Sequence, residues 1–167
     1  ALQVLGPVFV KFGQAISTRR DLLPPDIADE LVKLQDQVPP FEGAIARQLI
    51  VEALGAPIER NFRRFETEAL AAASIAQVHA AELIDGREVI VKVLRPGMRQ
   101  IIQRDIEVLY AIAALVDRYS SEAHRLRPVD VVREYEKTIL DELDLMREAA
   151  NAAHMKRNYA GDPKLHV

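Results

Sequence analysis

The 167-residue sequence contains no cysteine, which excludes disulfides, thiolate metal ligands and a cysteine nucleophile. It also lacks an excess of basic residues, because 22 Lys and Arg are set against 25 Asp and Glu, for a net charge of −3. Nucleic-acid binding normally relies on clustered Lys and Arg, so we expect no nucleic-acid partner.

Long hydrophobic runs are also missing. The longest, residues 108–116, is far shorter than the roughly 20 apolar residues that cross a membrane. The first residues include no Met and do not have the basic-then-apolar order of a signal peptide. Because the sequence opens without Met and stops abruptly, we expect a fragment of a longer protein.

The composition is that of a globular domain, with 49% hydrophobic and 28% charged residues and enough length to bury a core. The first third is mostly helical in pattern. Proline and glycine positions and apolar spacing predict helices over residues 2–20, 26–37, 42–53 and, more briefly, 58–65.

A β-hairpin follows the helices. We predict strands over residues 75–83 and 87–94, joined by a two-residue turn at Asp85–Gly86. Alternation in the second strand places Val89, Val91 and Val93 on one face and Lys92 on the other, with Ile90 and Leu94.

Two long amphipathic helices come next, and we expect them to cover the hairpin, which needs a partner surface. The predicted apolar stripe of the first is Ile102, Ile106, Leu109, Ile112 and Val116. That of the second is Val132, Tyr135, Ile139, Leu143, Met146 and Ala150. A turn at residues 161–163 and the start of another strand over 164–167 complete the prediction.

The hairpin and the loop before it carry the main chemical signal. A run of small residues, Ala71, Ala72, Ala73 and Ser74, precedes a strand that bears Lys92. Kinase-like proteins use this order, because small residues let backbone N–H groups approach phosphates and the lysine adds positive charge. The alternative is that Lys92 only keeps an exposed strand soluble.

Two further groups of residues stand out. The last helix offers Asp141, Glu142, Asp144 and Glu148 as partners for basic groups; the alternative is a solvated acidic face. The first helix contains Lys11-Phe-Gly-Gln14, in which Lys11 and Gln14 project to one side. Gly13 either permits a close approach by another element or marks a kink.

Taken in order, these segments resemble the UbiB family, atypical kinase-like proteins linked to ubiquinone biosynthesis, and its bacterial members most closely. Residues 11–14 match the KxGQ motif, and residues 71–74 match the Ala-rich loop that replaces the Gly-rich loop of protein kinases. Residues 77–79 and 91–96 are also similar to the family, and Glu142 and Asp144 match its ExD motif.

The resemblance implies a role for each matched residue. Lys92 would bind ATP or ADP and form an ion pair with Glu148, and Ala71, Ala72, Ala73 and Ser74 would cover the phosphates. Lys11, Gly13 and Gln14 would occlude the pocket in which kinases bind a protein substrate. Lys11 would pair there with Glu142 and Asp144.

The resemblance also implies an α+β fold. Residues 1–66 would form a helical extension and residues 67–167 a kinase-like small lobe with a short antiparallel sheet and two long helices. After Lys92 the sequence has no His-x-Asp…Asn run and no Asp-Phe-Gly-like run. We therefore expect the catalytic residues and the Mg²⁺ ligands in a C-terminal lobe that this chain lacks, and no catalysis by this chain alone.

For the parent protein, the resemblance implies an atypical kinase or ATPase that supports ubiquinone biosynthesis at the cytoplasmic side of the bacterial inner membrane. Its expected partners are a nucleotide, a quinone-precursor lipid or quinone-biosynthesis proteins, with peripheral membrane contact. The alternative is a non-catalytic helical module that binds a lipid or a protein through the apolar residues 4–10. A classical protein kinase is disfavoured, because it would have Gly in place of Ala71–Ala73.

Overall fold

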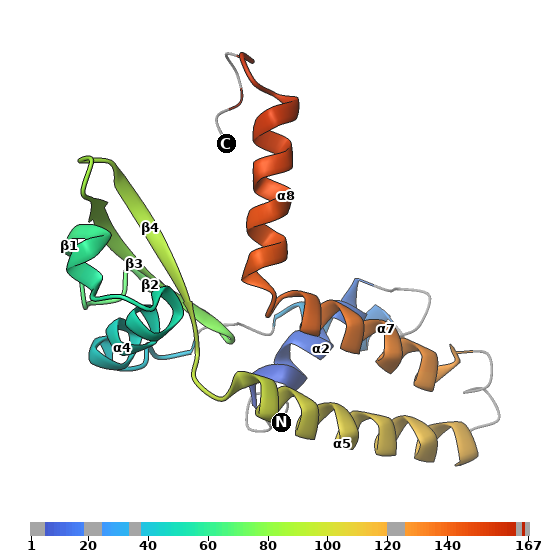
Figure 1. Ribbon diagram of the computed structural model, residues 1–167. Coiled ribbons are helices and arrows are strands. Elements are labelled where there is room, and N and C mark those ends of the chain that lie inside the picture. The colour runs from blue at the N-terminus through green and yellow to red at the C-terminus, as the bar shows by residue number, and fades with distance from the viewer. Residues whose placement is uncertain (1–5, 19–24, 34–37, 120–125, 163–164, 166–167) are drawn as a thin grey trace. The chain divides into compact units, whose positions relative to one another are not determined.

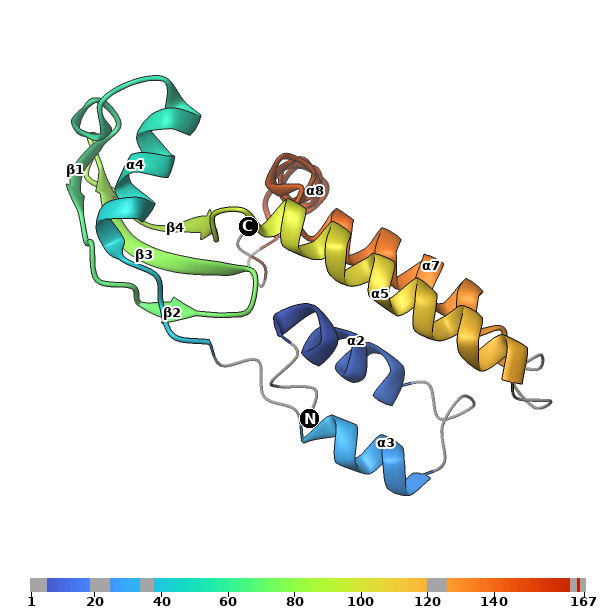
Figure 2. The same ribbon diagram turned by 90° about the horizontal axis from the view of Figure 1, so that it is seen from below.

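The chain forms a small antiparallel sheet and a set of helices, and it divides into two units, Ala1–Met98 and Arg99–Val167 (Figures 1 and 2). The computed structural model describes residues 6–18, 25–33, 38–119, 126–162 and 165. The predicted α+β class with a short antiparallel sheet is confirmed.

Three helices of the first unit lie where the sequence predicts them. Helix α2 (Pro7–Ser17) begins after Gly6, whose φ of 115° suits glycine, and Pro7 fits a first helical turn. Helix α3 (Pro25–Val32) contacts α2. Helix α4 (Gly43–Leu54) ends at Gly55 in the left-handed conformation. The remaining predicted parts of the first two helices lie mostly outside the described residues.

The short helix predicted over residues 58–65 is wrong. A 3₁₀ turn, η1 (Ile58–Arg60), leads instead into strand β1 (Phe62–Phe65). Phe62 and Phe65 are half-buried and pack against the core, whereas the two arginines between them are exposed. Pairing with a neighbouring strand and burial of the two rings therefore override the weak local helical pattern.

The sheet is built around one central strand. Strand β3 (Ala76–Leu83) pairs with β4 (Glu88–Leu94) along one edge. Along the other edge it pairs with β1 and then with β2 (Ala71–Ala72), all antiparallel. The hairpin of β3 and β4 confirms the two predicted strands.

The turn of this hairpin is longer than the predicted two residues. Leu83 N–H donates to the Arg87 carbonyl and Gly86 N–H donates to the Leu83 carbonyl, both at 2.9 Å. Gly86 has a φ of 88°, which a glycine adopts without strain. The Asp85–Gly86 signal therefore identified the hairpin, but Ile84 joins the turn.

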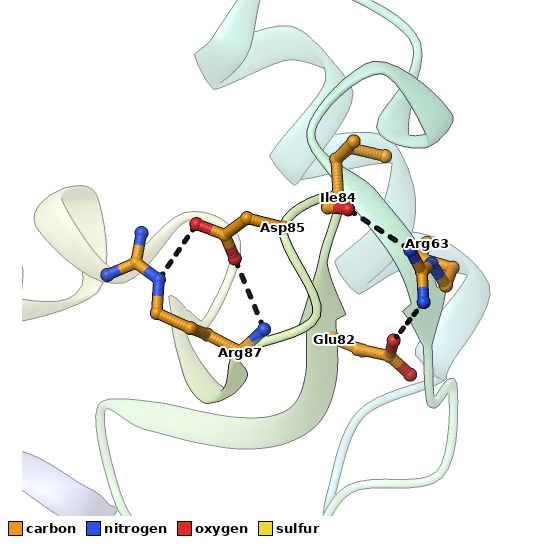
Figure 3. A network of polar contacts seen from close by, with 5 residues as sticks. All are labelled: Arg63, Glu82, Ile84, Asp85 and Arg87. Atoms are coloured by element: carbon orange, nitrogen blue, oxygen red, sulfur yellow. Dashed lines mark hydrogen bonds and ion pairs between the residues drawn. The ribbon is translucent and has the colours of Figure 1, made fainter.

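Polar side chains surround the tip of the hairpin (Figure 3). Asp85 accepts from the Arg87 backbone N–H at 3.1 Å and from its Nε at 2.8 Å. The backbone hydrogen bond from Arg87 is the main reason that the pKa of Asp85 lies below its usual value. On the other side, Arg63 donates to Glu82 at 3.0 Å and to the Ile84 carbonyl at 3.3 Å.

One face of the sheet is covered by α4, which carries the small core of this unit. The buried members of this core are Ala46, Ile50, Ile58 and Val93, with Phe41, Leu49, Val51, Phe62, Phe65 and Val91 packed around them. A Cβ on Gly43, the first residue of α4, would lie 1.9 Å from the Thr67 carbonyl oxygen. This approach requires glycine. The predicted cover of the hairpin by the two long helices stays a prediction, because those helices belong to the second unit.

In the second unit, α5 (Met98–Tyr119) and α7 (Pro128–Asp141) lie side by side (Figures 1 and 2). Tyr110 of α5 donates to the carboxylate of Glu136 of α7 at 2.7 Å. The predicted burial of Ile102, Ile106 and Leu109 is confirmed.

The predicted α5 stripe is wrong in its last two positions. Ile112 and Val116 are 48% and 42% exposed, and Ala113 is buried in their place. At 3.6 residues per turn, residue 113 continues the line through 102, 106 and 109 better than residue 112 does. The sequence has apolar residues on both sides of this helix, so periodicity alone does not select the buried side.

The second predicted long helix is interrupted. Val132, Tyr135, Ile139 and Leu143 are buried as predicted, but Met146 is 81% exposed and Ala150 is exposed. Helix α7 ends at Asp141, and a separate helix, α8 (Leu145–Asn158), begins after Asp144 in a new direction (Figure 1). The turn after it includes Gly161; the strand predicted over 164–167 lies outside the described residues, apart from Leu165.

Candidate functional site

Lys92 lies in a row of residues that crosses the sheet. It is opposite Val78 of β3, and Val78 is opposite Ala71 of β2. Residues directly opposite one another in antiparallel strands point to the same face, so the three side chains share one face. Two strand spacings place Lys92 roughly 10 Å from the Ala-rich loop, residues 71–74.

This face is the one opposite α4. Val91 and Val93, the neighbours of Lys92, turn toward the α4 core, so Lys92 turns away from it. Lys92 is exposed, and Ile90, two residues earlier on the same face, is 64% exposed. This face therefore combines an apolar surface, which can contact a flat base, with an ammonium group beside the Ala-rich loop, which can contact a phosphate.

The Ala-rich loop is a tight turn between β2 and β3. Ala71 and Ala72 form β2, and Ala73 N–H donates to the Ala76 carbonyl at 2.8 Å to close the turn. Ala71 and Ala73 are exposed, whereas Ser74 is completely buried. The backbone and the methyl groups of this loop are therefore the parts that a ligand can reach.

Arg95 supports the Ala-rich loop, and the sequence analysis missed it. Its Nε donates to the Ala73 carbonyl at 2.9 Å, and its Nη2 donates to the Pro39 carbonyl at 2.8 Å and the Val38 carbonyl at 3.3 Å. The guanidinium also lies 5.8 Å from the centre of the Phe41 ring. The sequence offered two signals: Arg95 lies between the end of a strand and Pro–Gly, and it belongs to the segment of residues 91–96 that resembles the family.

A buried polar network lies under the same sheet, and its centre is Gln77. The Gln77 Oε1 accepts from Phe41 N–H at 2.8 Å, and its Nε2 donates to the Phe41 carbonyl at 3.1 Å. The same Nε2 lies 3.0 Å from His79 Nε2, and His79 Nδ1 lies 2.8 Å from the Glu66 carbonyl. These partners assign a neutral His79 with its proton on Nδ1.

The residues of the KxGQ motif lie on α2. Lys11 and Gln14 are half-buried and three residues apart, so they occupy the same side of the helix. Gly13 is buried, and the helix continues through it. Ser17 Oγ donates to the Gln14 carbonyl at 2.6 Å.

The acidic residues of the ExD motif lie where α7 gives way to α8. Glu142 follows the last residue of α7, and Asp144 caps α8 by accepting from Arg147 N–H at 2.9 Å. A carboxylate is favoured at a helix N-terminus, so Asp144 has a structural role besides any role in the site. Glu148 is exposed in the first turn of α8.

The two predicted ion pairs each join the two units. Lys92 and Lys11 belong to the first unit, and Glu148, Glu142 and Asp144 belong to the second. Both pairs therefore stay predictions. Within the first unit, the structure brings Lys92 and the Ala-rich loop to one face of one sheet.

Asp105 of α5 is a buried carboxylate with an incomplete set of partners. Burial raises the pKa of Asp105, and the charge of Arg104, whose Nε lies 4.0 Å from the Asp105 carboxylate, lowers this pKa only in part. A raised pKa in the folded state means that stability decreases as the pH rises above the usual Asp value. We predict that Asp105→Asn raises the free energy of unfolding at pH 7 by on the order of 1 kcal/mol.

Urea unfolding at pH 7 and at pH 4 tests this prediction. The gain of Asp105→Asn over the unmodified protein should shrink at pH 4, where more of the Asp105 carboxyl is protonated. A variant that is less stable at pH 7 would show that the Asp105 carboxylate has stabilising partners.

Two absences among the described residues concern metals and membranes. In the ranges that the structure describes, no three His, Asp or Glu side chains gather as a metal site requires. Among the helices of those ranges, none is both long and apolar enough to cross a membrane.

Comparison with known proteins relates the chain to kinase-like proteins. The family model of the ABC1 atypical kinase-like domain matches residues 33–167. The chain is 61% identical over all 167 residues to a Pseudomonas paraeruginosa protein named "Probable protein kinase UbiB", and 60% identical to its namesake from Azotobacter vinelandii. It spans 31% of the length of these relatives.

A solved structure with a similar fold is that of Rv3197 from Mycobacterium tuberculosis, in complex with erythromycin. The TM-score is 0.59 at 29% sequence identity, over 90% of this chain and 38% of that protein. The resemblance noted in the sequence and the kinase-like fold are confirmed by these matches.

Proposed function

Because the chain belongs to the ABC1 atypical kinase-like family, we propose that its sheet binds the nucleotide of an ATP-using protein. The observation that supports this most is the row of Ala71, Val78 and Lys92 on the sheet face opposite α4. Lys92 would contact the phosphates, and the Ala-rich loop would cover them. The apolar side chains of the same face would contact the base.

Residues of the second unit would complete the site. Glu148 would form an ion pair with Lys92 and so fix the ammonium near the phosphates. Lys11 and Gln14 of α2, with Gly13 between them, would occlude the protein-substrate pocket, and Lys11 would pair with Glu142 and Asp144.

The activity of the whole protein is a wider proposal, because the chain spans about a third of its curated relatives. We propose an atypical kinase or ATPase that supports ubiquinone biosynthesis at the cytoplasmic side of the bacterial inner membrane. Its Mg²⁺ ligands and catalytic Asp and Asn would lie outside these 167 residues. Quinone-precursor lipids or quinone-biosynthesis proteins would be its partners.

We also propose that the chain has two functional parts, divided after residue 66. Residues 1–66 would act as a regulatory helical extension, and residues 67–167 as the kinase-like small lobe. The proposed boundary would divide two roles and not two packed units, because α4 and β1 precede residue 66 and pack with the sheet.

Calorimetric titration of the full-length protein with ATP and ADP, with and without Mg²⁺, tests the proposal. Saturable binding of either nucleotide supports it. Co-sedimentation with liposomes, without any nucleotide binding, would favour the lipid-binding alternative. That alternative rested on residues 4–10, in which Val8, Phe9 and Val10 are buried.

The Ala-rich loop should set the preference between nucleotides. Alanine does not adopt positive φ as readily as glycine, so Ala72→Gly or Ala73→Gly should loosen the loop and admit more phosphate poses. We expect either change to alter the ratio of ATP to ADP affinity by about two- to fivefold.

Calorimetry of the variants against both nucleotides measures this ratio. Ala160→Gly, an exposed position in the turn after α8, is the matched control and should leave it unchanged. Equal ratios in the loop variants and the unmodified protein would show that the loop does not select the nucleotide.

A further inference from the structure

The backbone of Arg95 is anchored next to the Ala-rich loop, independently of the contacts of its side chain. Its backbone N–H donates to the Ile75 carbonyl at 2.9 Å, next to the last residues of that loop. The side chain therefore starts from a fixed point. It reaches two separate segments of the chain, the Ala-rich loop and the segment of residues 38–41 that precedes α4.

Three hydrogen bonds of the Arg95 side chain go to backbone carbonyls. Nε donates to Ala73 in the loop, at 2.9 Å, and Nη2 donates to Pro39 and Val38, at 2.8 and 3.3 Å. A guanidinium presents these donors in a rigid planar fork, which lysine cannot reproduce. One side chain thus ties the loop to the segment of residues 38–41.

The segment of residues 38–41 is itself anchored to the sheet. Gln77, which is 1% exposed, bonds both the N–H and the carbonyl of Phe41. The Phe41 ring also lies beneath the Arg95 guanidinium, at 5.8 Å. Arg95 therefore connects the Ala-rich loop to a segment that is itself anchored to the sheet.

We propose that Arg95 is a positioning residue that holds the Ala-rich loop in one conformation for the phosphates of a nucleotide. The inference rests on the proposed function, because it assigns a purpose to the loop. Arg95 acts through the Ala73 carbonyl and does not itself contact the nucleotide. Its loss should loosen residues 71–74 while the sheet and its α4 core persist.

Arg95→Met in the full-length protein is the main test. Methionine keeps an unbranched apolar side chain but removes the donors. We expect hydrogen exchange of the amides of residues 71–76 to become about tenfold faster in the unliganded protein, because the Ala73 carbonyl loses its hydrogen bond from a charged donor. ATP affinity should fall by about tenfold. Arg95→Lys should restore little of either.

Arg87→Met is the matched control, because Arg87 lies at the far tip of the hairpin and its side chain bonds Asp85 (Figure 3). Loop exchange and ATP affinity should be unchanged in it. Thermal unfolding of all variants checks the fold. If Arg95→Met strongly lowers the temperature of the unfolding midpoint, Arg95→Lys is used as the test variant in its place. Hydrogen exchange of the loop and ATP affinity are then measured in Arg95→Lys.

A double variant separates positioning from general stabilisation. If Arg95 acts through loop conformation, adding Ala73→Gly to Arg95→Met should change the ATP-to-ADP ratio less than it does in the unmodified protein. Fully additive effects, or unchanged loop exchange in Arg95→Met, would overturn the proposal.

The two proposals fail in different ways. If Lys92→Ala lowers ATP affinity and Arg95→Met changes neither exchange nor affinity, only the role of Arg95 is refuted. If the unmodified protein binds no nucleotide, the proposed function fails, and with it the purpose assigned to the loop. Faster exchange in Arg95→Met would then show only that Arg95 holds the loop.

Discussion

Replacing Lys92 with alanine is expected to lower the affinity of the full-length protein for ATP by about ten- to a hundredfold. The reason is the loss of a charge-assisted hydrogen bond to phosphate, which is worth about 1.5–3 kcal/mol. Lys92 is exposed on the sheet face opposite the α4 core, so its removal should leave that core intact. Calorimetric titration of the variant with ATP measures the effect.

Two control variants sharpen this test. Lys92→Arg keeps the positive charge and should retain part of the affinity, although the longer guanidinium fits the site less well. Lys137→Ala removes the same charge from an exposed position on α7 and should bind ATP like the unmodified protein. Unchanged affinity in Lys92→Ala would refute the role of this lysine.

Replacing Gln77 with alanine is expected to lower the free energy of unfolding by about 2–4 kcal/mol. The change removes three hydrogen bonds at a buried position and leaves the N–H and carbonyl of Phe41 and a ring nitrogen of His79 without their partner. Each buried polar group left in this way costs about 1–3 kcal/mol. Urea unfolding of the variant and the unmodified protein measures the difference.

Gln103→Ala is the control for this second prediction. Gln103 is exposed on α5, and its replacement should change the unfolding free energy by less than about 0.5 kcal/mol. A similar, small effect of Gln77→Ala would mean that water or a local shift satisfies Phe41. The support assigned to Arg95 would then be weaker than the contacts suggest.

The hairpin shows what local sequence pattern can predict. Alternation alone placed the valines of β4 on one face and Lys92 on the other, because side chains in a strand change face at every residue. The structure adds that Val91 and Val93 pack on the α4 core. The glycine of the turn identified the hairpin for a similar reason, since few other residues adopt its φ of 88°. The division of side chains between the two faces of β4 could therefore be predicted, whereas the face that packs on the core is known only from the structure.

The interruption between α7 and α8 shows where periodicity fails. The apolar spacing continues from Leu143 to Met146 and Ala150, yet those last two residues are exposed. Asp144 caps a new helix, and this cap outweighs the continuing pattern. An Asp three residues before Arg147 is a weak capping signal that is recognised only once the helix start is known.

Arg95 and β1 show a further limit, that of long-range contacts. The carbonyls that Arg95 bonds belong to residues 38, 39 and 73, and nothing near residue 95 in the sequence identifies them. Strand β1 likewise forms because β3 offers an edge to Phe62 and Phe65. Both features depend on contacts between residues that are far apart in the sequence, and local sequence patterns do not predict such contacts.

The central claim is that a nucleotide binds to the sheet face that carries Lys92. Hydrogen exchange of the full-length protein, with and without ATP and Mg²⁺, tests it most directly. We predict that ATP slows exchange in residues 70–78 and 88–94 and leaves the hairpin tip, residues 84–87, unchanged. Saturating ATP that protects other parts of the protein and leaves residues 70–78 and 88–94 unchanged would contradict it.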